Sequence, residues 1–371
     1  MCKAFGIVNF EGMNVKVKGL QDYRPVGAFS FLGRYRIIDF PISNMSNSGI
    51  DHIQVFIRDK ARSLIEHLGT GRHYNINTKR GKLHIIPAEN GKENDFYNHD
   101  IACYIQNMQA IEEANYPYVI LAPSHMIYRT DYTQILEKHI QSGADITMLY
   151  QSVDNAKDSF RNCDMLMLNK QKGVLSIERN KGNAKVRNIS LETYVLSKQL
   201  FMNIIQKAAR TSSLYWFRDM VNEMCEELDI RGIAHRGYLA CINDFHSYYH
   251  ANMELIHYPL AKELFIEGWP IYTRTNDSAP TYYSQDSNVT NSTISNGCLI
   301  EGTIINSVIG RGCIIKKGAV IENSIISPGV IVGEDVHIAH VVVDKKAKIH
   351  RVKELCGDEQ NPLYVKRGDY I

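Results

Sequence analysis

The chain has 371 residues, 44% of them hydrophobic, and a formal net charge of +2. Its length exceeds what one hydrophobic core usually supports, so we expect a globular protein of two domains. The small net charge gives no reason to expect a nucleic-acid surface, and no apolar run approaches the roughly 20 residues that span a bilayer.

Strand and helix patterns alternate through the first 255 residues, beginning with a strand in residues 1–12, which lack the features of a signal peptide. Further predicted strands are residues 53–57, 118–122 and 146–150. The predicted helices have inward faces formed by Leu64, Ile65 and Leu68, by Ile101, Tyr104, Ile105, Met108 and Ile111, and by Ile135, Leu136 and Ile140. The alternation predicts an α/β domain over residues 1–255, with a mostly parallel sheet and helices on both faces.

Residues 256–284 follow no steady period and contain three prolines, so we interpret them as a linker. From residue 285 to residue 371 the sequence pattern is different, because aliphatic residues recur at intervals of six, six and five residues. The recurring residues are Ile309, Ile315, Ile321, Ile326, Val332, Ile338, Val343 and Ile349. Glycine follows the same rule, since Gly312 matches Gly329 after 17 residues.

This period predicts a left-handed parallel β-helix of hexapeptide repeats over residues 285–371. Each coil would contain three short strands, and each strand would contribute one aliphatic side chain to a continuous buried column. A sandwich of short strands is the less favoured alternative, because sandwich strands seldom keep so strict a count.

The eight cysteines are scattered, and no two have the C-x-x-C spacing of zinc or redox motifs. A chain of this size does not need disulfides, so we expect free thiols in a reducing cytoplasm.

Residues 33–50, GRYRIIDFPISNMSNSGI, combine cationic side chains, an apolar centre and an amide-rich turn. Together with residues 251–255, ANMEL, and the repeat, this segment resembles the ADP-glucose pyrophosphorylases, the glucose-1-phosphate adenylyltransferases of glycogen and starch synthesis. The resemblance covers nearly the whole chain and implies a Rossmann-like nucleotidyltransferase domain before the β-helix. It is greatest to the D-type glycogen-biosynthesis subunit of Gram-positive bacteria, the degenerate companion of the catalytic subunit.

The resemblance fails at the positions where the family carries out its chemistry. The family's glycine-rich phosphate loop corresponds to residues 11–17, where one glycine remains and only Lys16 keeps a positive charge. The lysine of the next family motif is replaced by Val26, and the two metal-binding aspartates correspond to Ser124 and Cys241. Magnesium prefers carboxylate and phosphate oxygens, so a serine and a thiol are poor substitutes.

The family's sugar-phosphate site is altered as well. Glu192 replaces a glycine, and its carboxylate would repel a phosphate. Ser190, His125 and Tyr128 match the family and, with Lys16, are expected to be remnants of the substrate pocket. We therefore predict that this chain has no catalytic residues, no metal and no cofactor, and that Mg²⁺ is used by a catalytic partner.

Four arginines are candidates for an anion site. The resemblance implies that Arg24 and Arg36 line an effector site for a small anion between the two domains. Arg34, which matches a family lysine, and Arg311, at a corner of the repeat, are further candidates. The alternative is that each is an ordinary surface or salt-bridged arginine.

The resemblance thus implies a cytoplasmic pseudoenzyme, a regulatory subunit that assembles with catalytic ADP-glucose pyrophosphorylase chains as a mixed tetramer or forms homo-oligomers. Two alternatives stay open. One is an active nucleotidyltransferase that holds metal through rebuilt ligands such as Asp131 and Asp244. The other is an acyltransferase that uses a β-helix histidine, among His337, His340 and His350.

Overall fold

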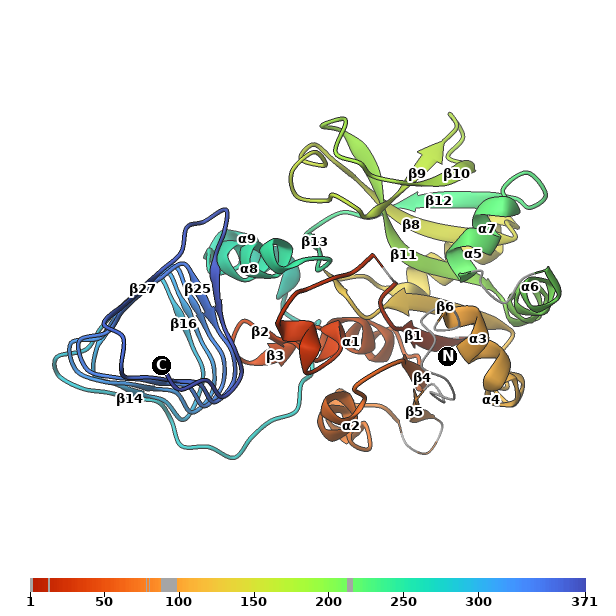
Figure 1. Cartoon of the computed structure of the whole chain (residues 1–371). Helices are drawn as coiled ribbons and strands as arrows, with labels where there is room; N and C mark the ends of the chain where they lie inside the picture. The colour runs from red at the N-terminus through yellow and green to blue at the C-terminus, as the bar shows by residue number, and fades with distance from the viewer. Residues whose placement is uncertain (1–2, 13, 78, 80, 88–98, 212–215) are drawn as a thin grey trace. The chain divides into compact units, whose positions relative to one another are not determined.

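The computed structural model describes residues 3–12, 14–77, 79, 81–87, 99–211 and 216–371 (Figure 1). The chain divides into two compact units. The first unit contains residues 1–15, 38–243 and 268–272, and the second contains residues 16–37, 244–267 and 273–371. This division does not follow the predicted boundary at residue 255.

A nine-stranded sheet forms the centre of the first unit in its described part. Its strands are β1 (Ala4–Asn9), β4 (His52–Ile57), β5 (Lys82–Pro87), β6 (Tyr118–Pro123), β8 (Ile146–Val153), β9 (Asp164–Leu168), β10 (Val174–Arg179), β11 (Arg187–Ser197) and β12 (Ile230–Ala234). Parallel pairing joins β6, β1, β4 and β5, as predicted. The sheet is mixed, however, because β11 runs antiparallel to β6, β8 and β9.

Helices cover both faces of this sheet. They are α1 (Asp39–Asn47), α2 (Arg62–Leu68), α3 (Asp100–Gln106), α4 (Met108–Glu112), α5 (Tyr132–Ser142), α6 (Lys198–Thr211) and α7 (Phe217–Glu223). Phe5 and Ile7 of β1 belong to one core with side chains of α3, α6 and α7. Because side chains alternate along a strand, Gly6 faces the other side, where Met45 of α1 lies against it.

The predicted helices exist, but their inward faces were partly wrong. Ile65, Ile105 and Ile140 are 44, 38 and 44% exposed. In α5, Ile135 and Leu136 are buried as predicted, but His139 is buried in place of Ile140, and its Nδ1 lies 2.9 Å from the hydroxyl of Thr147. The expected helix over residues 101–111 is two short helices, α3 and α4.

The second unit contains the predicted β-helix, built from three five-stranded parallel sheets in the described residues, and Figure 1 shows its triangular cross-section. One sheet contains β14 (Tyr282–Tyr283), β17 (Leu299–Ile300), β20 (Ile314–Ile315), β23 (Ile331–Val332) and β26 (Lys348–Ile349). The next contains β15 (Asn288–Thr290), β18 (Thr303–Ile305), β21 (Val320–Glu322), β24 (His337–Ala339) and β27 (Glu354–Cys356). The third contains β16 (Thr293–Ile294), β19 (Val308–Ile309), β22 (Ile325–Ile326), β25 (Val341–Val343) and β28 (Leu363–Val365).

All eight aliphatic residues predicted to face inward are fully buried in one core, which confirms the repeat. Gly312 and Gly329 have φ angles of 65° and 74°, the left-handed conformation that glycine adopts without strain at a corner.

The predicted linker contains a helix, α9 (Tyr258–Leu264), which follows α8 (Phe245–Glu254). Pro259 lies in the first turn of α9, where its missing N–H removes no helical hydrogen bond, so it was wrong to count this proline as a sign of a linker.

Residues 16–37 and 244–267 belong to the second unit because polar contacts hold them there. Asn252 of α8 accepts the N–H of Leu32, and Tyr249 donates to the carbonyl of Asn323 at a corner of the β-helix. Residues 16–37 also include the short strands β2 (Ser30–Phe31) and β3 (Tyr35–Arg36). None of the helices in the described ranges combines the length and apolar character that crossing a membrane requires.

Candidate functional site

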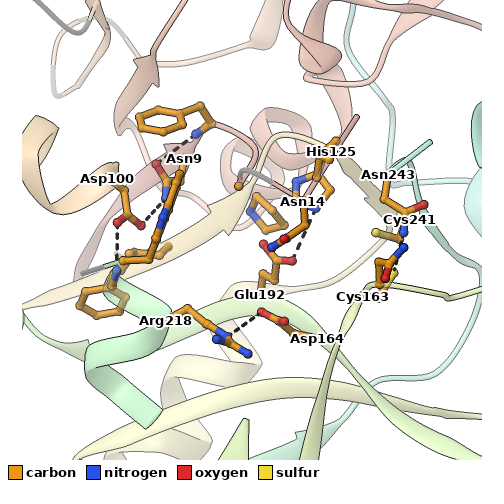
Figure 2. Close-up of a pocket in the computed structure, with 18 of the residues that line it drawn as sticks. Asn9, Asn14, Asp100, His125, Cys163, Asp164, Glu192, Arg218, Cys241 and Asn243 are labelled. Atoms are coloured by element: carbon orange, nitrogen blue, oxygen red, sulfur yellow. Dashed lines mark hydrogen bonds and ion pairs between the residues drawn. The ribbon is translucent and has the colours of Figure 1, made fainter. Parts of the chain in front are cut away.

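A cavity of about 280 Å³ lies in the first unit, beside the carboxyl ends of β1 and β6, where Asn9 and Pro123 line it (Figure 2). Ligands of α/β proteins bind at this edge of the sheet, so the cavity is the candidate site. Its polar and charged lining includes Asn9, Asp100, His125, Asp164, Arg179, Glu192, Arg218, Asp219 and Cys241.

The two positions that match the family's metal ligands lie on neighbouring elements. Ser124 follows β6 and is buried, and its N–H donates to the carbonyl of Asn9. Cys241 ends the short strand β13 (Leu239–Cys241), which pairs with β7 (Met126–Tyr128). Cys241 lines the cavity, whereas Ser124 does not. A hydrogen bond with Cys163, together with burial, raises the pKa of the Cys241 thiol, so it stays protonated.

An ion pair between His125 and Glu192 occupies the cavity. The His125 Nε2 and the Glu192 Oε1 are 3.5 Å apart, and His125 is 1% exposed (Figure 2). Burial acts to lower the pKa of His125, but the carboxylates of Glu192, Glu11 and Asp164 together outweigh it and the pKa is raised. Burial acts to raise the pKa of Glu192, but His125 and two arginines outweigh it and that pKa is lowered. Each member of the pair therefore favours the charged form of the other.

The backbone of Glu192 is strained where it places this carboxylate. Its φ angle is 46°, in the left-handed region, at a register irregularity of β11 between Ser190 and Tyr194. Such a conformation costs a residue with a Cβ about 1 kcal/mol or more. The glycine that the resemblance implies here would adopt it freely, so the substitution adds both strain and negative charge.

The two arginines of the cavity are already bound by carboxylates. The Nε of Arg218 lies 3.1 Å from Asp164, and the Nη2 of Arg179 lies 3.5 Å from the same carboxylate. Arg218 also pairs with Asp219 at 2.5 Å. Burial and the nearby Glu192 raise the pKa of Asp164 to about 6.

Asp100, at the start of α3, was missed at the sequence level. Its carboxylate accepts hydrogen bonds of 2.9 Å from the Asn9 amide and from the backbone N–H of Phe217 (Figure 2). Burial raises its pKa to about 7. No motif in the chain pointed to this residue, because its partners are distant in sequence.

The other predicted pocket residues lie outside the lining of this cavity. Tyr128 is buried, and its hydroxyl lies 2.6 Å from that of Thr193. Ser190 is buried in β11, where its hydroxyl accepts the N–H of Glu192. Lys16 is exposed and belongs to the second unit, as does the fully buried Val26.

Arg24 and Arg36 belong to a group of cations in the second unit. Arg24 is 2% exposed and pairs with Asp344, with 2.5 Å between Nη2 and Oδ1. Burial, then the charges of Arg36 and Arg24, and finally that of Arg367 lower the pKa of Lys345 to about 7. Lys345 and Arg367 were not predicted. These four residues are called the cation cluster below.

Arg34 and Arg311 line a different cavity, of about 500 Å³, in the same unit. The guanidinium of Arg311 donates to the backbone carbonyls of Arg34 and Arg274, each at 3.2 Å. The predicted set of four arginines is thus distributed over two places.

The carboxylates of the rebuilt-ligand alternative serve as helix caps. Asp131 accepts the N–H of Thr133 at the start of α5, and Asp244 accepts the N–H of Ser247 at the start of α8. In the ranges that the structure describes, no grouping of three metal-ligating side chains includes either aspartate or a residue of the cavity. The histidines of the acyltransferase alternative have different neighbours: His337 pairs with Glu322, His340 with Tyr249 and His350 with Tyr370.

Comparisons with known proteins agree with both units. Residues 16–160 match the nucleotidyl transferase family, and residues 279–362 match the GlmU-like C-terminal hexapeptide family. The chain is 30% identical to the glycogen biosynthesis protein GlgD of Geobacillus stearothermophilus, over 86% of this chain and 83% of the relative. It is 27% identical to GlgD of Bacillus subtilis, over 98% and 95% of the two chains. It is 29% identical to the glucose-1-phosphate adenylyltransferase of Clostridioides difficile, over 82% and 80%.

Proposed function

The chain belongs to the ADP-glucose pyrophosphorylase family, close to GlgD, and from this premise we propose that it is a regulatory subunit in glycogen biosynthesis without catalytic activity of its own. The names of its relatives support the role in glycogen biosynthesis. The observation that carries the proposed lack of catalysis is the charge balance of the cavity, whose ionic side chains pair with one another.

Adenylyl transfer requires cationic groups for a triphosphate and carboxylates for Mg²⁺. Here Arg179 and Arg218 contact Asp164, and His125 contacts Glu192. The positions of the family's metal ligands present a serine and a protonated thiol, a donor set that does not fit Mg²⁺. A polyphosphate entering this cavity would be repelled by the carboxylates, and the cationic side chains that could bind it are already paired with those carboxylates.

The cation cluster supports the second half of the proposal, a response to a small anion. Burial, followed by its cationic neighbours, lowers the pKa of Lys345 to about 7, so an anion bound beside these cations would favour protonation of Lys345. The subunit would then bind the effector and pass the response to a catalytic glucose-1-phosphate adenylyltransferase chain.

Mixing the purified chain with a catalytic adenylyltransferase chain from the same organism tests this function. We expect the two to elute as one complex in size-exclusion chromatography, and the activity or anion response of the catalytic chain to change. Separate elution together with unchanged kinetics would contradict the proposal.

A further inference from the structure

The register of the β-helix places several metal-ligating side chains on the outer face of one sheet. The strands β21, β24 and β27 are neighbours in this parallel sheet, and each residue is paired with the residue 17 positions later in the chain, on the next strand. Two rows result: Val320, His337 and Glu354, and Glu322, Ala339 and Cys356. Ile321 and Ile338 lie in the buried core, so the residues on either side of them point outward.

Ala339 lies among four of these side chains. Glu322 and Cys356 are its register partners on the two adjacent strands, His337 precedes it by two residues, and Glu354 is the register partner of His337. Because alanine ends at Cβ, it does not fill the space between the longer side chains around it. At the centre of these four residues, Ala339 therefore contributes no side-chain atom beyond Cβ.

The donor atoms are already close together. The Nε2 of His337 is 3.0 Å from a carboxylate oxygen of Glu322, and the Sγ of Cys356 is 3.4 Å from a carboxylate oxygen of Glu354. Ligand atoms of His337, Glu354 and Cys356 all lie within 4.8 Å of one another. Zinc bonds of about 2.0–2.3 Å place tetrahedral ligands about 3.3–3.8 Å apart, so these three side chains need only small rotations. Glu322 contacts His337 but is outside that group of three, so its carboxylate would have to rotate toward Glu354 and Cys356 to become the fourth ligand.

We propose that His337, Glu322, Glu354 and Cys356 form a binding site for a zinc ion. Nitrogen and sulfur donors favour zinc over magnesium or calcium, which prefer sites made of oxygen alone. Two carboxylates and a thiol lie on this exposed surface. A zinc ion would replace the thiol proton, which is released to solvent, and would offset most of the negative charge of the two carboxylates and the thiolate.

The ligands come from three consecutive coils, one from β21, one from β24 and two from β27. In this sheet β27 is the last strand, and β24 is its neighbour. A shared ion would therefore hold the last coil to the preceding ones, which matters because a terminal repeat has a neighbour on one side only.

Titration of the chelator-treated, reduced full-length chain with Co²⁺ and then Zn²⁺ tests the site. We expect one Co²⁺ per chain, an absorption band from thiolate-to-cobalt charge transfer, and displacement of cobalt by zinc. A chain without that band, or one that binds no ion, would overturn the proposal. The titration should be done in a Cys2→Ser background, because Cys2 lies outside the described residues.

Single substitutions then identify the ligands. Cys356→Ser should abolish the band, and His337→Gln should weaken binding by at least about tenfold, the minimum loss seen when the surroundings of a metal are disturbed. The matched controls are Cys225→Ser, at another cysteine that is not fully buried, and His250→Gln, at a histidine paired with Glu254 at 3.3 Å. Both controls should keep one ion per chain, and equal loss in controls and ligand variants would refute the assignment.

Hydrogen exchange gives a second, local readout. Zinc should slow amide exchange in residues 354–356 of the wild-type chain and leave it unchanged in Cys356→Ser. Ala339→Leu removes no ligand but fills the space above the sheet, so it should also weaken binding. If zinc did not change amide exchange in β27, the proposal that the ion links the last coil to the preceding ones would be contradicted.

Discussion

The cavity of the first unit and the cation cluster of the second differ in their charge balance: cationic and anionic side chains are paired in the cavity, whereas cations predominate in the cluster. In the cavity, Asp164 and Glu192 each contact cationic side chains, so the ionic groups are paired within the protein. In the cluster, Arg36, Arg24 and Arg367 lie near Lys345 and lower its pKa to about 7, with Asp344 as the carboxylate that opposes them. The first arrangement is poorly suited to an anionic substrate, whereas the second is suited to a small anion.

The largest expected effect comes from removing the carboxylate of the cluster. Asp344→Ala should destabilise the chain by about 3–5 kcal/mol, because Arg24 would be left buried without its partner. Asp344 also accepts hydrogen bonds from Tyr364 and from the N–H of Lys345. Urea denaturation measures the change.

The control for that experiment is the exposed pair of Lys207 and Glu227, at 3.0 Å. Glu227→Ala should cost less than about 1 kcal/mol, since surface ion pairs contribute little. Equal losses for the two variants would show that the cluster is not specially dependent on Asp344.

The next largest effect should come from removing the carboxylate of Glu192 from the cavity, which would make the cavity less hostile to an anionic substrate. Glu192→Gly removes a carboxylate and relieves a φ angle of 46°, so binding of glucose 1-phosphate should improve by at least about tenfold, from the loss of close-range repulsion. Calorimetry with glucose 1-phosphate measures the affinity. Glu192→Gln removes the charge but keeps the side chain, and should give a smaller gain; no gain in either variant would contradict the role of Glu192.

The cation cluster should bind anions in a pH-dependent way. The pKa of Lys345 is about 7 in the folded chain, so phosphate or sulfate affinity should rise as the pH falls from 8 to 6, by at most about tenfold per pH unit. Calorimetry with sulfate, which does not titrate in this range, in buffers with different ionisation enthalpies should show proton uptake on binding. Lys345→Met should remove the uptake, and a wild-type chain without uptake would contradict the assignment.

The same lowered pKa has a consequence for stability. The folded chain releases a proton from Lys345 at lower pH than the unfolded chain, whose lysine has the ordinary pKa near 10.5. Between about pH 7 and 10.5 the unfolded chain therefore binds more protons, and the contribution of this group to stability rises with pH.

The smallest effect tests the rebuilt-ligand alternative. Asp244→Ala should cost about 1 kcal/mol of stability, because it removes the N-cap of α8, and it should leave Mn²⁺ or Mg²⁺ binding unchanged. Asp131→Ala at the start of α5 is the matched variant. Loss of metal binding in either variant would support the alternative that the chain is an active nucleotidyltransferase with rebuilt metal ligands.

The β-helix was predictable in detail because its repeat is a property of spacing alone. Residues such as Ile315 and Val332 are buried for the same reason in every coil. The helix faces of the first unit were less predictable, since Ile105 and Ile140 fit the period but lie beyond the edge of the packed surface. Helix α9 was missed because Pro259 ends a helix in most positions but not in its first turn.

Residues of the candidate site could be predicted only where they occupy a position in a motif of the family that the chain resembles. Ser124, Cys241 and Glu192 were found because they stand at places where the resemblance implies other residues. Asp100 and Lys345 were not found, because their environment depends on side chains about 90 to 320 residues away in the chain, such as Asn9 and Arg24. Charge balance in a cavity is a property of the fold, which no local pattern reports.

Formation of ADP-glucose by the purified chain alone is the most direct measurement. With ATP, glucose 1-phosphate and Mg²⁺ at saturating concentrations and the protein at high concentration, the account predicts no product above the reaction without protein. Sustained, Mg²⁺-dependent turnover by the wild-type chain, free of any catalytic subunit, would contradict it.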